Sequence, residues 1–191
     1  MSITNATYTS PDWTGYKYPS SLAPLPDWMS RGLTAICAFS ILSIITCLTL
    51  LSYITYLLVK GGASYRAAVR KNQYVILIYS VLIADLQLST GFLISIKWLH
   101  DDQMYAPSSA CIAQACLTHV GDLASGLSGL AIAAHTFLAV VFGRKLEGYT
   151  FYSVVVGLWV LSILLTAIPV ILHPADIIVV GGNWVTSSIC Y

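Results

Sequence analysis

The sequence predicts an all-α membrane protein with four transmembrane helices. Of its 191 residues, 57% are hydrophobic and only 9% are charged, whereas a typical soluble domain has about 25% charged residues. The apolar residues gather in four runs, and each run is long enough for the roughly 20 residues that cross a bilayer as a helix. The formal net charge is +1, so the composition offers no basic face for nucleic acid.

Short polar segments separate the four apolar runs and set their boundaries. The predicted transmembrane helices are residues 33–59, 74–99, 110–142 and 151–172. The loops between them are residues 60–73, 100–109 and 143–150, and the terminal tails are residues 1–32 and 173–191. The first run carries no charge, Asp85 interrupts the second, and the third is polar in its first half.

The charges of the loops predict how the helices are oriented. The first loop holds four basic residues and no acid, the third holds Arg144 and Lys145 with one acid, and the second holds only acids. Because basic loops stay in the cytoplasm, we expect a multi-pass plasma-membrane protein with both ends outside. The sequon at Asn5 then lies on the outer side. Three tryptophans lie near the predicted outer boundaries, as in an aromatic belt: Trp28, Trp98 and Trp184.

Basic residues in the first loop have a second interpretation besides orientation. Arg66, Arg70 and Lys71 lie close together in the sequence, and basic residues near a membrane surface attract anionic lipid headgroups. Membrane lipid is therefore one expected partner, although the orienting role alone also explains these charges.

Two carboxylates lie within the predicted membrane helices, Asp85 in the second and Asp122 in the third. Burying a charge at bilayer depth costs at least about 2.5 kcal/mol, so such groups face protein or water. At 3.6 residues per turn, small and polar residues of the third helix form one stripe: Cys111, Ala115, Thr118, Asp122, Ser125, Gly129 and Thr136. This stripe predicts a central helix, but each aspartate can instead be a hydrogen-bonded residue that only holds helices together.

The remaining chemistry-bearing residues do not form a catalytic or metal-binding set. No group of His, Cys and acidic residues has zinc spacing, and Ser125 and Ser128 lack the base and orienting partner of a nucleophile triad. His119 and His135 are better explained by packing or hydrogen bonding. We therefore expect neither an enzyme nor a resident cofactor.

Of the five cysteines, two lie on the predicted outer side. Cys111 begins the third helix, and Cys190 lies in the tail after the fourth. Disulfides persist in the oxidising compartment that both residues face, which predicts a Cys111–Cys190 bridge. Free or intermolecular thiols are the alternative.

Several of these features occur together in one known architecture. The outer cysteine pair, the "ADL" aspartate Asp85 in the second helix and Trp159 in the fourth resemble the first four helices of a rhodopsin-like, seven-helix G-protein-coupled receptor. More particularly, "LIADLQLSTGFLISIKWL", "GDLASGLSGLAIAAHTFLAVVFGRK" and "HPADI" look similar to orphan receptor-like proteins of filamentous fungi, which stand near the nutrient-sensing and cyclic-AMP-receptor-like groups. The resemblance covers residues 35–191.

The resemblance implies roles for individual positions. Asp85 matches the aspartate that binds a sodium ion in many such receptors, and Ser125 matches a serine that helps to hold that ion. It implies that the cavity for an extracellular small-molecule ligand is lined by Thr118, His119 and Asp122. It implies that a heterotrimeric G protein docks at the inner end of the third helix and the following loop: His135, Thr136, Phe137, Arg144 and Lys145. Cys111 and Cys190 match the outer disulfide.

The sequence also departs from the receptor pattern. His135-Thr136-Phe137 stands where an acidic–Arg–aromatic triplet is expected, and the first helix lacks the usual asparagine. The three further helices of such a receptor would follow Tyr191. We therefore expect the front half of a receptor, a truncated product, or a four-helix protein in its own right.

Two other functions stay open. A tetraspan scaffold is one, although such proteins usually keep both ends in the cytoplasm. A proton or solute transporter is the other, because Asp85 and Asp122 could relay protons. Transporters often contain repeated halves, and this sequence has no matching halves.

Overall fold

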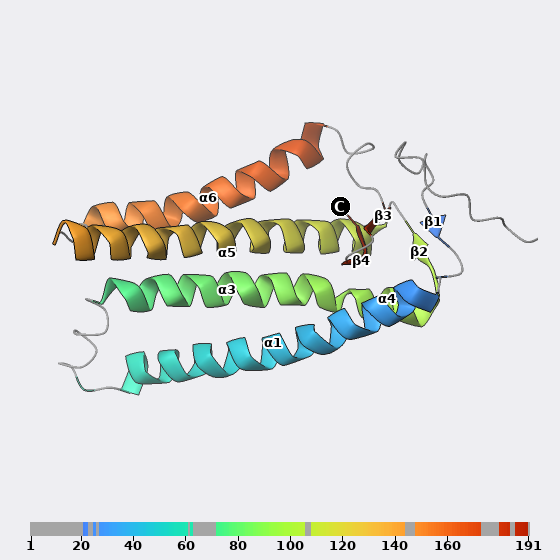
Figure 1. The fold of residues 1–191 in the computed structure, drawn as a ribbon, viewed down its shortest axis with the longest axis horizontal. Helices are drawn as coiled ribbons and strands as arrows, with labels where there is room; N and C mark the ends of the chain where they lie inside the picture. The colour runs from blue at the N-terminus through green and yellow to red at the C-terminus, as the bar shows by residue number, and fades with distance from the viewer. Residues whose placement is uncertain are drawn as a thin grey trace, which may run out of the picture.

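The protein folds into long helices that lie side by side (Figure 1). The computed structural model describes residues 21–22, 25, 27–60, 62, 72–105, 108–143, 148–172, 180–183 and 186–190. Its helices are α1 (Asp27–Lys60), α3 (Gln73–Leu93), α4 (Ser95–Asp101), α5 (Ser109–Val141) and α6 (Gly148–Leu172). Within these residues, four spans are long and apolar enough to cross a membrane, with α3 and α4 together forming the second. The predicted all-α membrane fold with four spanning helices is confirmed.

The first helix is longer than its apolar run. α1 begins at Asp27, six residues before the predicted start at Leu33. An acidic residue in the first turn and Lys60 in the last turn both oppose the partial charges of the helix ends, so polar residues extend the helix at each end. At 1.5 Å per residue, its 34 residues measure about 51 Å, which exceeds the roughly 30 Å hydrocarbon core. α1 therefore tilts or projects beyond the bilayer.

Two helices begin with capping side chains. The Asn72 side chain accepts a hydrogen bond from the Tyr74 amide at the start of α3, at 3.1 Å. The Ser108 hydroxyl accepts one from the Cys111 amide at the start of α5, at 3.2 Å. Asn and Ser are favoured at this position because they satisfy amides that have no partner within the helix.

The second span is divided by a turn at Ile94. The Ile94 amide donates to the Gly91 carbonyl at 3.2 Å, and the Lys97 amide donates to the Ile94 carbonyl at 2.9 Å. These three-residue bonds replace the regular helical pattern. α4 then ends at Asp101, and the next residue, Asp102, has a left-handed φ of 48°. The sequence predicted one continuous helix over residues 74–99, and no proline marks the break.

The helices form a row in which α3 and α5 are central. α3 packs against α1 and α5, and α6 packs against the far side of α5, as Figure 1 shows. Two glycines allow α3 and α5 to approach closely. A Cβ at Gly121 would lie 2.7 Å from the Leu88 backbone nitrogen, and one at Gly91 would lie 2.8 Å from Thr118 Cγ2. Small residues at such contacts are typical of membrane helices, whose lipid-facing sides carry the large apolar residues.

Short strand pairs lie near one end of the helices (Figure 1). β1 (Ser21–Leu22) pairs antiparallel with β2 (Met104–Tyr105), and β3 (Val180–Asn183) pairs antiparallel with β4 (Thr186–Cys190). β4 contacts both α1 and α5. The same end contains a small apolar core in which Met29 and Leu33 of α1 pack with Trp98 and Cys111. We name this end the outer end after the orientation predicted from the loop charges, and the opposite end the inner end.

Candidate functional site

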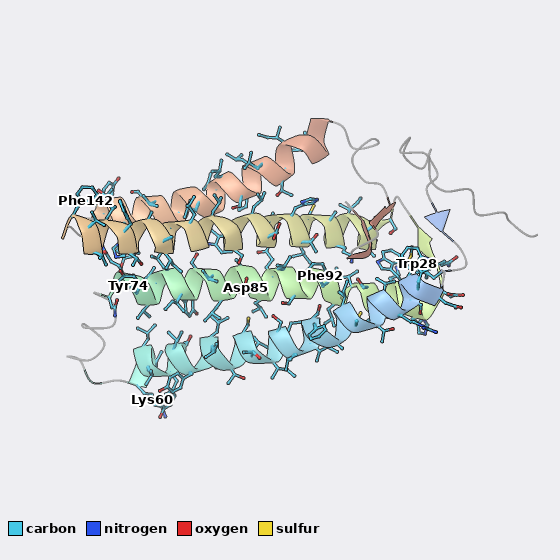
Figure 2. All side chains as sticks on the ribbon, viewed as in Figure 1. Trp28, Lys60, Tyr74, Asp85, Phe92 and Phe142 are labelled. Carbon is cyan, nitrogen blue, oxygen red and sulfur yellow. The ribbon has the colours of Figure 1, made fainter. Side chains whose placement is uncertain are left out.

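Polar side chains follow the interface between the second span, α3 with α4, and α5 over most of its length. They form three hydrogen-bonded groups, one near the outer end, one beside Asp85 in the middle (Figure 2) and one farther inward. Each group joins different helices. Together they form the candidate site, because buried polar groups within a bilayer are costly and are retained where they bind, signal or hold helices in register.

The outer group is centred on Gln114 of α5. The Trp98 indole Nε1 donates to Gln114 Oε1 at 2.7 Å, and Gln114 Nε2 donates to the Ser95 hydroxyl at 2.9 Å. Ser95 and Gln114 are completely buried, and Trp98 is 2% exposed. The amide of Gln114 therefore satisfies two polar groups of α4 and fixes this helix against α5.

The middle group contains the intramembrane carboxylate. The Ser125 hydroxyl of α5 donates to Asp85 Oδ1 of α3 at 2.7 Å, and both residues are half-buried. One turn further along α3, the Ser89 hydroxyl donates to the Ser43 hydroxyl of α1 at 2.8 Å. Three helices thus contribute oxygen atoms to this level of the bundle.

The inner group joins α3, α5 and α6. The Trp159 indole Nε1 donates to the Ser80 hydroxyl at 2.9 Å, and the Ser80 and Ser128 hydroxyls are 3.2 Å apart. Since Ser80 accepts from the indole, its own proton is available for Ser128. This junction is the main polar link between α6 and the other helices among the described residues.

His135 lies beyond the inner group, at the end of α5. Its ring is 3% exposed and is enclosed by the Tyr74 ring at 4.9 Å and the Phe151 ring at 5.9 Å between centroids. Its Nδ1 atom has no hydrogen-bond partner among the described residues. His135 therefore packs inside the bundle, as the sequence suggested, and does not form part of an exposed inner face.

The residues proposed for G-protein docking are distributed over different environments. Thr136 and Phe137 are exposed, and the Thr136 hydroxyl donates to the Ile132 carbonyl of its own helix. Arg144 and Lys145 lie outside the described residues, as do the sequon residue Asn5 and Trp184.

The residues proposed to line the ligand cavity also differ in how far they are buried. Thr118 is buried, and its hydroxyl donates to the Gln114 and Ala115 carbonyls at 2.8 and 3.1 Å. His119 is half-buried and Asp122 is exposed. Of the predicted polar stripe, Cys111, Ala115 and Thr118 are buried, but Gly129 and Thr136 are exposed together with Asp122. The buried face of α5 is therefore rotated away from Asp122, toward Gly121 and Ala124.

The two cysteines of the predicted bridge lie in α5 and β4. Cys111 is completely buried at the first turn of α5, and Cys190 ends β4, which packs against α5. The free thiols among the described cysteines are Cys37, Cys47 and Cys116, and Cys111 is not one of them.

The sequence did not predict two parts of the site. Gln114 carries no charge, but an amide within an apolar helix indicates a buried hydrogen-bond partner. Trp98 was assigned to the aromatic belt, but it is buried within the bundle. Trp28, by contrast, is exposed at the start of α1, as a belt residue should be.

The chain was compared with known protein families and with curated proteins. No family model matches it, and no curated protein is similar to it. Functional argument therefore depends on the geometry of the bundle.

Proposed function

We propose that this chain forms the first four helices of a membrane receptor that resembles the G-protein-coupled receptors. The observation that carries the proposal is the Asp85–Ser125 hydrogen bond, which joins α3 to α5 at 2.7 Å within the membrane. A carboxylate shared between two helices changes their attraction when its proton or counter-ion changes. Such a bond can link the occupancy of a site to the arrangement of helices, which is the basis of conformational signalling.

The inner junction supports the same proposal. Trp159, Ser80 and Ser128 connect α6, α3 and α5 at one level, so movement of one helix is transmitted to the other two. Trp159 and Asp85 are two of the residues on which the resemblance to rhodopsin-like receptors rests. Their hydrogen bonds give both residues a defined place in the bundle.

Asp85 and Ser125 are suited to hold a sodium ion. A hard cation prefers oxygen ligands, and this level of the bundle offers the Asp85 carboxylate and hydroxyl groups from three helices. When bound, the ion would supply a positive charge that compensates the carboxylate. The role of Asp85 and Ser125 is to provide those oxygen atoms and to keep α3 and α5 in contact.

In the proposed orientation, the N-terminus and the strand pairs lie outside the plasma membrane. An extracellular small molecule would act at the outer half of α5, near Asp122, which is exposed. A heterotrimeric G protein would bind at the opposite end, where Thr136 and Phe137 are exposed.

The experiment compares Asp85→Asn with the unchanged full-length protein in membranes that contain the host's heterotrimeric G protein. Basal guanine-nucleotide exchange is measured in sodium chloride and in choline chloride, together with surface expression. We expect sodium to alter exchange in the unchanged protein and to have no effect in Asp85→Asn, while expression changes little. Asp101→Asn, at an exposed outer position, is the matched control and should behave like the unchanged protein.

Other outcomes distinguish the alternatives. If Asp85→Asn reduces exchange and expression equally, the carboxylate has a structural role and the receptor proposal loses its main support. If no G protein responds under any condition, a tetraspan scaffold is favoured. A pH-dependent proton flux that Asp85→Asn abolishes would instead identify a transporter.

A further inference from the structure

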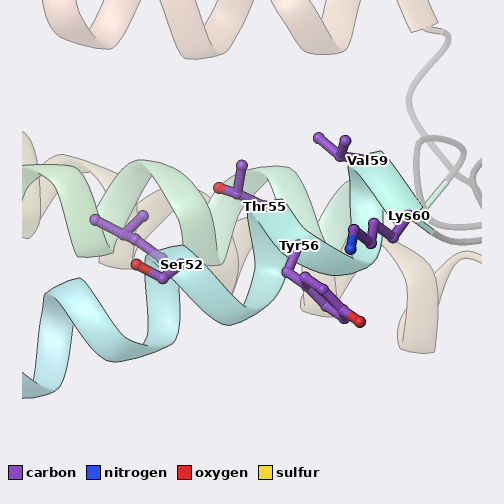
Figure 3. A pocket seen from close by; sticks show the side chains of 6 residues that line it. Ser52, Thr55, Tyr56, Val59 and Lys60 are labelled. Carbon is purple, nitrogen blue, oxygen red and sulfur yellow. The ribbon is translucent and has the colours of Figure 1, made fainter.

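A shallow groove lies at the inner end of α1, away from the α3–α5 interface. It has a volume of about 430 Å³ and is lined by one face of the helix: Leu51, Ser52, Thr55, Tyr56, Val59 and Lys60. Figure 3 shows these side chains along the last turns of α1. The Thr55 hydroxyl is 3.4 Å from the Tyr79 hydroxyl of α3, which ties this part of α1 to its neighbour.

Lys60 gives the groove one positive charge. Its Nζ atom lies 5.5 Å from the centroid of the Tyr56 ring, a distance at which the ring face attracts a cation. This contact holds the ammonium beside the groove, as Figure 3 shows. Lys60 is also the last residue of α1, where the helix dipole favours a cation. The groove lining contains no acidic residue.

The position of the groove along α1 matches the boundary between lipid tails and headgroups. Val59 is the last residue of the apolar run, and Lys60 directly follows it. Leu51 and Val59 offer an apolar wall, whereas Ser52, Thr55 and Tyr56 offer hydroxyl groups. A molecule that fits this surface has an apolar chain on one side and an anionic, hydrogen-bond-accepting group on the other.

Charge decides between the lipids that could occupy such a groove. The loop that follows Lys60 adds Arg66, Arg70 and Lys71 and has no acid, and each basic residue near an anionic surface contributes about 1 kcal/mol. A sterol has no charge to match these residues, although the spacing of Leu51, Tyr56 and Lys60 also fits a weak sterol-contact pattern. The positive charge favours a phospholipid with a net negative headgroup.

We propose that this groove binds one anionic phospholipid of the inner leaflet. Its phosphate lies at the Lys60 ammonium, and an acyl chain lies along Leu51 and Val59. The site is separate from the proposed receptor function, since it contains neither Asp85 nor Ser125.

Native mass spectrometry of the purified full chain in detergent tests the proposal. The unchanged protein, Lys60→Ala and Lys97→Ala are titrated with palmitoyl-oleoyl phosphatidylglycerol and with the matching phosphatidylcholine. We expect Lys60→Ala to weaken the first phosphatidylglycerol adduct about fivefold, the factor that corresponds to about 1 kcal/mol, and to leave phosphatidylcholine binding unchanged. Tyr56→Leu should weaken the same adduct, because it removes the ring that holds the ammonium.

Lys97→Ala is the matched control. Lys97 is an exposed cation whose Nζ lies 5.7 Å from the Trp98 ring centroid at the other end of the bundle, so it shares the charge and the ring contact but not the groove. It should change phosphatidylglycerol binding less than twofold. Melting temperatures of the variants show whether each one is folded.

Four results would overturn the proposal. The first is equal phosphatidylglycerol binding by folded Lys60→Ala and the unchanged protein, and the second is an equal loss in Lys97→Ala. The third is displacement of the lipid by cholesterol with Lys60 making no difference, which would assign the groove to a sterol. The fourth is displacement of the lipid by inorganic phosphate at the same concentration, which would show that the groove binds a soluble anion.

Discussion

At the scale of single residues, the bundle depends on polar side chains whose partners lie on other helices. Gln114 is the clearest case, because it is completely buried and bonds to both Trp98 and Ser95. Hydrogen bonds between membrane helices contribute only about 0.6 kcal/mol on average. A buried donor that loses its partner, however, costs about 1–3 kcal/mol. Gln114 therefore stabilises the protein mainly by giving the buried Trp98 indole a hydrogen-bond acceptor.

Gln114→Leu should destabilise the folded protein by about 1–3 kcal/mol. The substitution leaves the Trp98 Nε1 proton without an acceptor, whereas the Ser95 hydroxyl can turn to a carbonyl of the preceding helical turn. The free energy of unfolding is measured in mixed detergent micelles, with Gln103→Leu at an exposed position as the control. A double-mutant cycle with Trp98→Phe should show a cost smaller than the sum of the single changes. Equal effects of the two glutamine variants would contradict this account.

At the scale of helices, the smallest residues of α5 determine where it comes closest to α3. Gly121 lets the Leu88 backbone approach so closely that no Cβ fits, and Ala124 and Ser128 continue the same face. Asp122 neighbours Gly121 in the sequence but is exposed. The buried face therefore differs from the polar stripe predicted around Asp122. That prediction assumed that polar residues are buried, whereas the closest contact is made by the smallest residues.

Gly121→Ala should separate α3 from α5 and destabilise the protein by about 1–3 kcal/mol, as overpacking does. The new Cβ would lie 2.7 Å and 2.9 Å from the nitrogen and Cα of Leu88, and backbone atoms cannot move aside as a side chain can. Gly126→Ala provides the control on the same helix, since a Cβ there meets nothing within 4 Å. That change should be neutral or stabilising, because alanine favours a helix by about 1 kcal/mol. Similar melting temperatures for the two variants would show that the contact is not close.

The sequence could predict the number of helices but not the details of their contacts. Hydropathy is averaged over about 20 residues. Four apolar runs therefore predict four spans, although no single residue identifies a span. The turn at Ile94 depends on how α4 packs through Trp98 and Gln114, and neither proline nor glycine stands at that position. The Asp85–Ser125 contact was anticipated from the resemblance, whereas Ser43 and Ser89 were not, since serines at such spacing are common in any membrane helix.

At the scale of the whole molecule, different elements meet at the two ends of the bundle. Trp98 and Cys111 pack into one apolar core with α1, and β4 lies against both α1 and α5. Toward the inner end, Trp159 and Phe151 join α6 to the bundle. A covalent link between β4 and the head of α5 would fix the segment after α6 to the same core.

The Cys111–Cys190 bridge can be tested by counting reactive thiols. The denatured, unreduced protein should react with an alkylating reagent at three of its five cysteines, namely Cys37, Cys47 and Cys116, and at all five after reduction. Mass spectrometry of an unreduced digest should find the Cys111 and Cys190 peptides joined. Cys116→Ser should lower the number of thiols that react before reduction to two and keep the joined peptides. Cys111→Ser should raise that number to four by releasing Cys190.

Because the bridge closes a loop of nearly 80 residues, its loss should lower the free energy of unfolding by about 2–4 kcal/mol. Five reactive thiols before reduction would rule out the bridge and would remove one support for placing this end of the bundle outside the cell.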